Sequence, residues 1–195
     1  PKLIAELAHI KVNQTAYIGG WLVAAYATMQ FIFSPFMGSL SDFIGRRPVL
    51  LFSLFGLVVD YLVMAYAPTI GWLFAGRLFA GIMGASFTTA SAYIADISEP
   101  EKRAQNFGMI GVAFGVGFIL GPALGGILGK FNIHYPFFAA AILSFLNLLY
   151  GFFILPESLP KEKRRKFSLK RANPVGSLMQ ISKFPAVAGF LLPLA

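Results

Sequence analysis

The chain has 195 residues, of which 57% are hydrophobic and only 12% charged, and its formal net charge is +8. Soluble domains carry about 25% charged residues, so this composition excludes an ordinary soluble domain and indicates a membrane protein. The absence of cysteine excludes disulfides and thiol chemistry.

Five long runs with few or no charges predict five membrane-spanning helices. A bilayer core about 30 Å thick requires roughly 20 apolar residues of helix. The runs place these helices near residues 17–39, 48–67, 72–95, 104–128 and 135–155. The strands of a membrane barrel would instead alternate in hydrophobicity over about 10 residues. The predicted fold class is therefore an all-α membrane protein.

The cationic side chains are distributed unevenly between the two predicted sides of the membrane. Arg46 and Arg47, Lys102 and Arg103, and the basic run 161–171 follow the first, third and fifth helices, whereas Lys2, Lys11 and Lys130 lie on the other side. Because cytoplasmic loops are enriched in Lys and Arg, the first group is predicted to be cytoplasmic. The net positive charge is explained by this asymmetry and not by nucleic-acid binding.

The chain divides into three predicted parts. Residues 1–155 form a helical bundle, residues 156–183 form a basic cytoplasmic linker with Pro160 and Pro174, and residues 184–195 begin a further bundle. The last apolar run stops well short of the length that crosses a bilayer. We therefore expect the chain to be a fragment.

Asp60 and Arg77 are the charged residues that lie well inside predicted spans. From the helical rise, Asp60 lies about 18 Å from the inner side and Arg77 about 9 Å from the outer side. Both thus fall in the outer half of the membrane, where a lone charge costs at least about 2.5 to 3.5 kcal/mol. Two interpretations stay open: Asp60 is a proton or cation site tuned by Arg77, or the two residues form a permanent structural ion pair.

A face of small residues runs along the fourth span, the 104–128 helix. Gly117, Gly121 and Gly125 recur every four residues, with Pro122 and Gly126 beside them. Small residues at this spacing allow two helix backbones to approach closely, and the proline removes one helical hydrogen bond and permits a bend. The face therefore serves either plain close packing or a helix that flexes during gating.

The turn after the first span carries a second group of polar and small residues. With a partner at the end of the third span, the group consists of Gly38, Asp42, Gly45, Arg46, Arg47 and Asp96. Gly45 permits a backbone conformation that other residues avoid. Asp42 and Asp96 are candidate partners for Arg46 in charge-assisted hydrogen bonds. The alternative is a structural turn whose charges only fix topology.

Gln30 and Asn147 are polar residues inside the first and last spans. Each either lines a substrate cavity or joins helices through a hydrogen bond worth about 0.6 kcal/mol. The sequence contains no metal-ligand cluster, phosphate-binding loop or nucleophile motif, so an enzyme is not expected.

Several of these motifs together resemble the major facilitator superfamily. Gly38-x-x-x-Asp42-x-x-Gly45-Arg46-Arg47 resembles the loop between its second and third helices, although Phe43 stands where the family usually has Arg or Lys. The pattern that begins at Gly108 and runs from Gly117 to Gly126 resembles the fifth-helix motif of its proton-coupled drug antiporters. Arg77 with Gly81, Gly84 and Ala85 is similar to the fourth-helix motif.

Within the family, the chain looks most similar to bacterial tetracycline efflux pumps. The segments that carry this likeness are 26–30, 50–54, 60–62, 92–96 and 136–139. The resemblance implies helices two to six, a central loop and the start of helix seven of a two-bundle transporter of the bacterial inner membrane. Helix one and the C-terminal bundle would be the missing partners.

The resemblance also implies a mechanism, alternating access with exchange of protons for a drug. The drug is expected to travel alone or chelated to a divalent cation, with no resident cofactor beyond the proton gradient. Two alternatives remain: a related carrier of another solute, and a truncated membrane module that does not transport.

Overall fold

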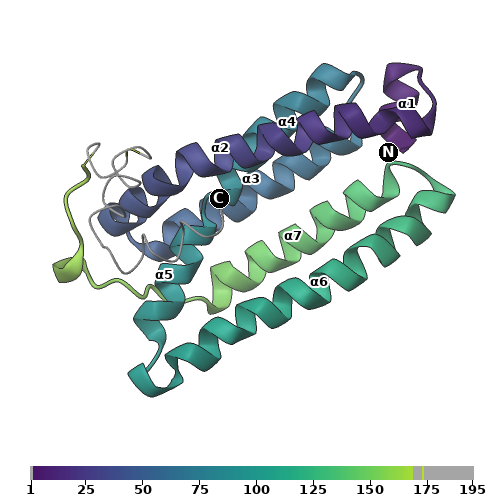
Figure 1. Ribbon diagram of the computed structural model, residues 1–195. Helices are drawn as coiled ribbons and strands as arrows, with labels where there is room; N and C mark the ends of the chain where they lie inside the picture. Colours follow the sequence, from purple (N-terminus) through teal and green to yellow (C-terminus); the bar gives the residue numbers. More distant parts are fainter. Residues whose placement is uncertain (1, 169–172, 174–195) are drawn as a thin grey trace, which may run out of the picture.

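The structure is a computed structural model that describes residues 2–168 and residue 173. Its helices are α1 (Lys2–Ala8), α2 (Thr15–Ile44), α3 (Arg46–Ala65), α4 (Ile70–Gly84), α5 (Phe87–Ile97), α6 (Arg103–Phe131) and α7 (Tyr135–Ile154) (Figure 1). Three short 3-10 helices, η1 (Val12–Gln14), η2 (Pro100–Lys102) and η3 (Lys161–Lys163), complete the elements. The predicted start of a further bundle at 184–195 lies outside the described residues.

Five segments of the described chain are long and apolar enough to cross a membrane, which confirms the predicted number. The span predicted near 72–95 corresponds to residues 70–97. The structure divides that span into α4 and α5, with Ala85 and Ser86 in a turn between them. Helix α1 was not predicted, and its Leu3 side chain is buried against Leu22, Met64 and Leu73.

The break between α4 and α5 has a local cause in the hydrogen bonds around Gly84. The side-chain amide of Gln30 donates to the Gly84 carbonyl over 3.2 Å. The Thr88 amide, which would bond that carbonyl in a regular helix, instead donates to the Ala85 carbonyl over 3.4 Å. The turn is therefore tightened where a side chain from α2 takes over a backbone acceptor.

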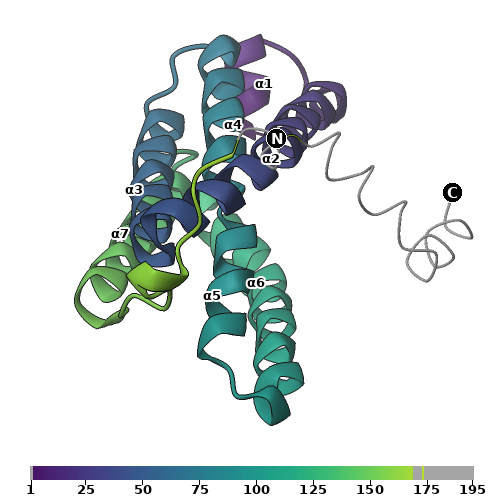
Figure 2. The ribbon, with the colours of Figure 1, turned by 90° about the vertical axis from the view of Figure 1, so that its left-hand side faces the viewer.

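The helices are packed unevenly around the bundle. The closest pairs are α3 with α7 and α2 with α4, and α3 also packs on α4. Figure 2 shows α5 and α6 diverging from the rest at the lower end of the view. Helix α6 has no buried residue in the described part of the chain.

Large apolar side chains cover much of the outer surface, as expected for helices in contact with lipid. Phe118, Phe131 and Phe153 are 83%, 78% and 75% exposed. Two clusters of buried apolar residues are present, one around Leu22 and Leu73, the other around Met37, Val49 and Ala85. Both clusters lie among α2, α3 and α4, which form the packed part of the bundle.

Gly81 sets how closely α4 approaches α2. A Cβ atom at Gly81 would lie 2.5 Å from the Tyr26 carbonyl oxygen and 2.7 Å from the Met29 Cβ. The first of these neighbours is backbone, so it cannot move aside without moving the helix. The glycine is thus required by the contact and not by its backbone dihedral angles.

Replacing Gly81 by Ala is expected to destabilise the bundle by about 1 to 3 kcal/mol, since an added methyl group overpacks the α2–α4 contact. The measurement is the temperature at which half of the detergent-solubilised protein loses its monodisperse gel-filtration peak. Gly71→Ala in the same helix is the matched control, because the added atom there would meet only the Thr69 hydroxyl, at 3.7 Å. Equal midpoints for the two variants would contradict the prediction.

Candidate functional site

Asp60 and Arg77 form a direct ion pair inside the predicted membrane region. The Arg77 Nη2 atom donates to Asp60 Oδ2 over 2.8 Å, joining α3 to α4. The Asp60 side chain is fully buried, whereas a quarter of the Arg77 side chain is exposed. The similar depths deduced from the helical rise agree with this contact.

The second carboxylate oxygen of Asp60 has no hydrogen-bond partner among the described residues. It faces Gly76, where an added Cβ atom would lie 2.9 Å from Asp60 Oδ1. The hydroxyl of Ser53, two helical turns away on α3, is also buried without a partner. One oxygen therefore holds Arg77, and the other is available to a proton or to a hydrogen-bond donor.

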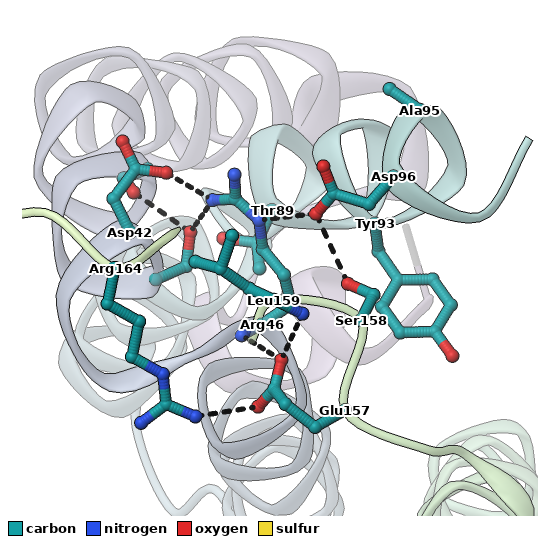
Figure 3. A network of polar contacts seen from close by, with 12 residues as sticks. Asp42, Arg46, Thr89, Tyr93, Ala95, Asp96, Glu157, Ser158, Leu159 and Arg164 are labelled. Atoms are coloured by element: carbon teal, nitrogen blue, oxygen red, sulfur yellow. Dashed lines mark hydrogen bonds and ion pairs between the residues drawn. The ribbon is translucent and has the colours of Figure 1, made fainter. Parts of the chain in front are cut away.

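The turn between α2 and α3 and the end of α5 meet at Arg46. Its Nη1 atom contacts Asp42 Oδ1 at 2.6 Å and the Ser41 hydroxyl at 2.6 Å, and its Nε atom contacts Asp96 Oδ2 at 3.2 Å (Figure 3). The Arg46 side chain is 10% exposed. We call Asp42, Arg46 and Asp96 the latch. The candidate partners that the sequence suggested for Arg46 are both in contact with it.

The two glycines of this motif, Gly38 and Gly45, lie in different backbone environments. Gly45 has a φ of 111°, in the region that favours glycine, and links the last residue of α2 to the first of α3. Gly38 lies inside α2, where an added Cβ would meet only the Thr88 hydroxyl at 3.8 Å. Gly45 is thus a conformational requirement, whereas Gly38 has room for a methyl group in ordinary contact with α5.

Arg47 does not join the latch, although the sequence grouped it there. Its Nη2 atom donates to the Phe152 carbonyl over 2.5 Å, and its guanidinium carbon lies 5.8 Å from the centre of the Phe152 ring. The neighbouring arginines thus point to different elements, Arg46 to α5 and Arg47 to α7.

The small-residue face of α6 has no partner within the described part of the chain. Added Cβ atoms would meet nothing within 4 Å at Gly108, Gly117, Gly121, Gly125 and Gly126. Helix α6 remains continuous through Pro122. Neither interpretation of this face, close packing or flexing, is tested by contacts among the described helices.

Gln30 and Asn147 line the same cavity, which has a volume of about 880 Å³. Aromatic and aliphatic side chains form most of its wall, among them Tyr26, Phe114 and Tyr150. Gln30 also donates to the Gly84 carbonyl, so it lines a cavity and joins two helices at once. Cavities that are mostly apolar with a few polar groups are typical of small-molecule sites.

Glu157 and Ser158 were missed by the sequence analysis. Glu157 Oε1 accepts hydrogen bonds from the Arg46 and Leu159 amides, and the Ser158 hydroxyl donates to Asp96 Oδ2 (Figure 3). The available signal was that Glu157 is the first charge after a long uncharged run and directly follows Pro156. Because Glu157 lies in a predicted linker with many charged residues, nothing in the sequence distinguished it from a solvated charge.

Comparison with known proteins identifies the family. A model of the Major Facilitator Superfamily matches residues 4–194, and the chain belongs to this family. The prediction of a major facilitator helical bundle, and with it an all-α membrane protein, is confirmed.

Among the relatives are bacterial proteins named for tetracycline resistance. The chain is 46% identical over 191 residues to the class C tetracycline resistance protein of Escherichia coli, covering 98% of this chain and 48% of the relative. It is 46% identical over 158 residues to the class G protein of Vibrio anguillarum, covering 81% and 40%. The predicted likeness to tetracycline efflux pumps is confirmed, and the chain spans half or less of the length of these relatives.

A solved structure also matches. The crystal structure of the human organic anion transporter MFSD10 has a TM-score of 0.69 and 38% sequence identity, and the match covers 75% of this chain and 34% of that chain. The likeness therefore extends from sequence to the arrangement of the helices.

Breaking the intramembrane pair from one side is expected to cost more stability than removing both charges. Arg77→Met leaves Asp60 buried without its cation, which we expect to cost about 3 kcal/mol, the lower end of the usual range because Arg77 is partly exposed. The double variant Asp60→Asn with Arg77→Met is expected to unfold close to the unmodified chain. Thermal midpoints in detergent measure both, and a double variant as unstable as Arg77→Met would contradict the prediction that the unpaired Asp60 charge causes the loss.

Replacing Gly45 by Ala is expected to destabilise the turn by about 1 to 3 kcal/mol, because its φ of 111° and ψ of 160° lie in a region that is essentially restricted to glycine. The added atom would also overlap the Glu157 carboxylate and lie 2.9 Å from Arg164 Nη2. Gly38→Ala is the matched control, since it makes only an ordinary contact in a regular helix. Thermal midpoints that fall equally for both variants would contradict this assignment.

Proposed function

We propose that this chain is part of a proton-coupled antiporter that exports a tetracycline-like drug across the bacterial inner membrane by alternating access. The observation that carries the proposal is the fully buried Asp60, paired with Arg77 through one oxygen and unpartnered at the other. The names of the bacterial relatives support the drug class. The proposal contains no catalytic step.

Proton coupling follows from the energetics of this pair. An ionised Asp60 is stabilised by Arg77, and a protonated Asp60 leaves the cation without its partner in a region of low dielectric. A change in the position of α3 relative to α4 would therefore change proton affinity at Asp60. Conversely, protonation would weaken the contact that joins these helices, so that proton uptake and helix movement are linked.

The latch supplies the conformational part of the proposal. It joins the α2–α3 turn to the end of α5, on the side of the membrane predicted to be cytoplasmic. Contacts of this kind stabilise one arrangement of the helices and are absent from the other. We infer that the latch is closed in the arrangement described here and opens in the alternate state.

The cavity that contains Gln30 and Asn147 is the proposed contribution of this bundle to drug binding. The rest of the path would come from helix one and a C-terminal bundle, the proposed partners within the same transporter. A divalent cation, where the drug carries one, would be cargo chelated by the drug and not a cofactor of the protein.

A second candidate is a related carrier of another solute. The match to a structure described as a human organic anion transporter favours this alternative, because it is at the level of both fold and sequence. The two candidates share the latch and the intramembrane pair and differ only in what occupies the cavity.

The test is energy-dependent tetracycline accumulation in efflux-deficient bacteria that express the complete reading frame encoding this chain. Low accumulation is expected for the parent protein, with loss of this effect when a protonophore is added. Asp60→Asn is expected to raise accumulation to the level of vector-only cells, because the site can no longer be ionised. Glu99→Gln, the same change at a side chain that is 67% exposed, is the matched control and should resemble the parent.

Two outcomes would reject parts of the proposal. Equal accumulation in parent and vector-only cells would reject tetracycline export and favour another solute or a non-transporting module. Low accumulation in the Asp60→Asn variant, at equal expression, would reject proton coupling through Asp60 and favour the structural interpretation of the pair.

A further inference from the structure

The segment that follows α7 bonds to every residue of the latch. The Arg165 amide donates to the Asp42 carbonyl over 2.9 Å, and the Arg46 amide donates to Glu157 Oε1 over 2.9 Å. The Ser158 hydroxyl donates to Asp96 Oδ2 over 3.2 Å. We call residues 157–167 the strap. Its three bonds are made to elements that lie far from it in the sequence.

Glu157 is the central group of the strap. Its carboxylate lies at the first residue of α3, where a negative charge interacts favourably with the helix dipole and satisfies a free amide. Its other oxygen, Oε2, lies 3.8 Å from Arg164 Nη2, within the strap itself. The close approach of Gly45 to this carboxylate, with no room for a side chain, shows that the turn and the strap fit each other.

The end of the strap is held by aromatic rings. The centre of the Phe167 ring lies 5.5 Å from that of Phe36 and 6.5 Å from that of Phe43, both on α2. Aromatic pairs at such separations are favourable. Phe43, which stands where the family motif usually has a basic residue, thus contacts the strap. Nearer the start of the strap, Leu159 is buried.

Glu157 and Ser158 are consecutive residues, but they bond to different sides of the latch (Figure 3). Glu157 holds the start of α3, and Ser158 holds the end of α5. Because consecutive Cα atoms are fixed about 3.8 Å apart, both bonds cannot persist when α3 and α5 separate. Opening the latch must therefore break at least one contact of the strap.

We propose that the strap is a further part of the latch, with Glu157 as a positioning residue that is docked while Arg46 binds Asp96 and is released when that ion pair opens. This proposal rests on the proposed function, because only a transporter that changes conformation needs to open the latch. If docking of the strap favours closure of the latch, closure of the latch favours docking of the strap to the same extent, because coupling between two equilibria is reciprocal.

The test uses cross-linking and does not depend on transport. The chain contains no cysteine, so Phe43→Cys and Phe167→Cys introduce its only thiol pair, at a described contact, and any cysteine elsewhere in the complete transporter is first replaced by Ser. The rate of intramolecular cross-linking by a short bismaleimide, followed by loss of thiols that react with a polyethylene glycol maleimide, reports the docked fraction. The complete transporter is used, purified in detergent.

In this background, Glu157→Ala is expected to lower the cross-linking rate by roughly tenfold, the effect of losing a charge-assisted hydrogen bond. Glu162→Ala, at an exposed glutamate of the same strap, is the matched control and should leave the rate unchanged. An unchanged rate in the Glu157→Ala variant would overturn the role of Glu157.

The coupling to the latch is tested with the neighbouring arginines. Arg46→Ala removes the ion pairs of the latch but keeps the backbone amide that Glu157 accepts from, so a merely local contact would survive it. We expect the cross-linking rate to fall severalfold in this variant and to stay unchanged in Arg47→Ala, which contacts α7 instead. If Arg46→Ala does not yield monodisperse protein, Asp42→Asn provides the same comparison, because it weakens the ion pair with Arg46 and keeps the backbone carbonyl that Arg165 bonds to.

A rate that Arg46→Ala or Asp42→Asn leaves unchanged would overturn the proposal, since the strap would then dock independently of the latch. Failure of the proposed function would give a different result, because parent and vector-only cells would then accumulate tetracycline alike. The cross-linking rates are measured on purified protein and do not depend on that result.

Discussion

The guanidinium of Arg46 is the interaction on which the cytoplasmic end of the bundle depends. It connects the end of α2, through Asp42, with the end of α5, through Asp96. Both carboxylates remain about one-third exposed, whereas Arg46 itself is nearly buried. A cation that is removed from water in this way needs its anionic partners, while the partners can return to solvent at low cost. This difference in burial between Arg46 and its two partners is compatible with an ion pair that forms in one conformation and breaks in another.

Charge-free runs made the helices and the intramembrane pair predictable. In a membrane, the length of a span and the cost of a buried charge are fixed by the bilayer, so the sequence alone constrains where helices lie and which charges must meet. Asp60 and Arg77 could be matched because the helical rise converts their positions in the sequence into depths. The same reasoning brought Arg46 and Asp96 together, since both follow spans that end on the same side.

Other features depend on atoms that no periodic pattern reveals. The break at Ala85 and Ser86 lies where the Gln30 side chain of α2 donates a hydrogen bond to the Gly84 carbonyl. A hydropathy pattern does not reveal such a bond. The return of the chain to the latch after Pro156 could not be predicted either, because in the sequence Glu157 looks like any other charged residue of a solvated linker. Arg47 was grouped with the latch because it is adjacent to Arg46 in the sequence. Adjacent residues of a helix point in different directions, so the two side chains contact different elements.

Because the helices pack unevenly, opening the latch would affect helices that the latch does not contact. Helix α6 packs mainly on α7 and α5, and α5 is the element that carries Asp96. In the proposed mechanism, release of Asp96 therefore frees the cytoplasmic end of α5, and this freedom passes to α6 through their direct contact. In the proposed mechanism, the small-residue face of α6 therefore moves with the part of the bundle that the latch releases, which would connect the two motifs that resemble the family although they make no contact with each other.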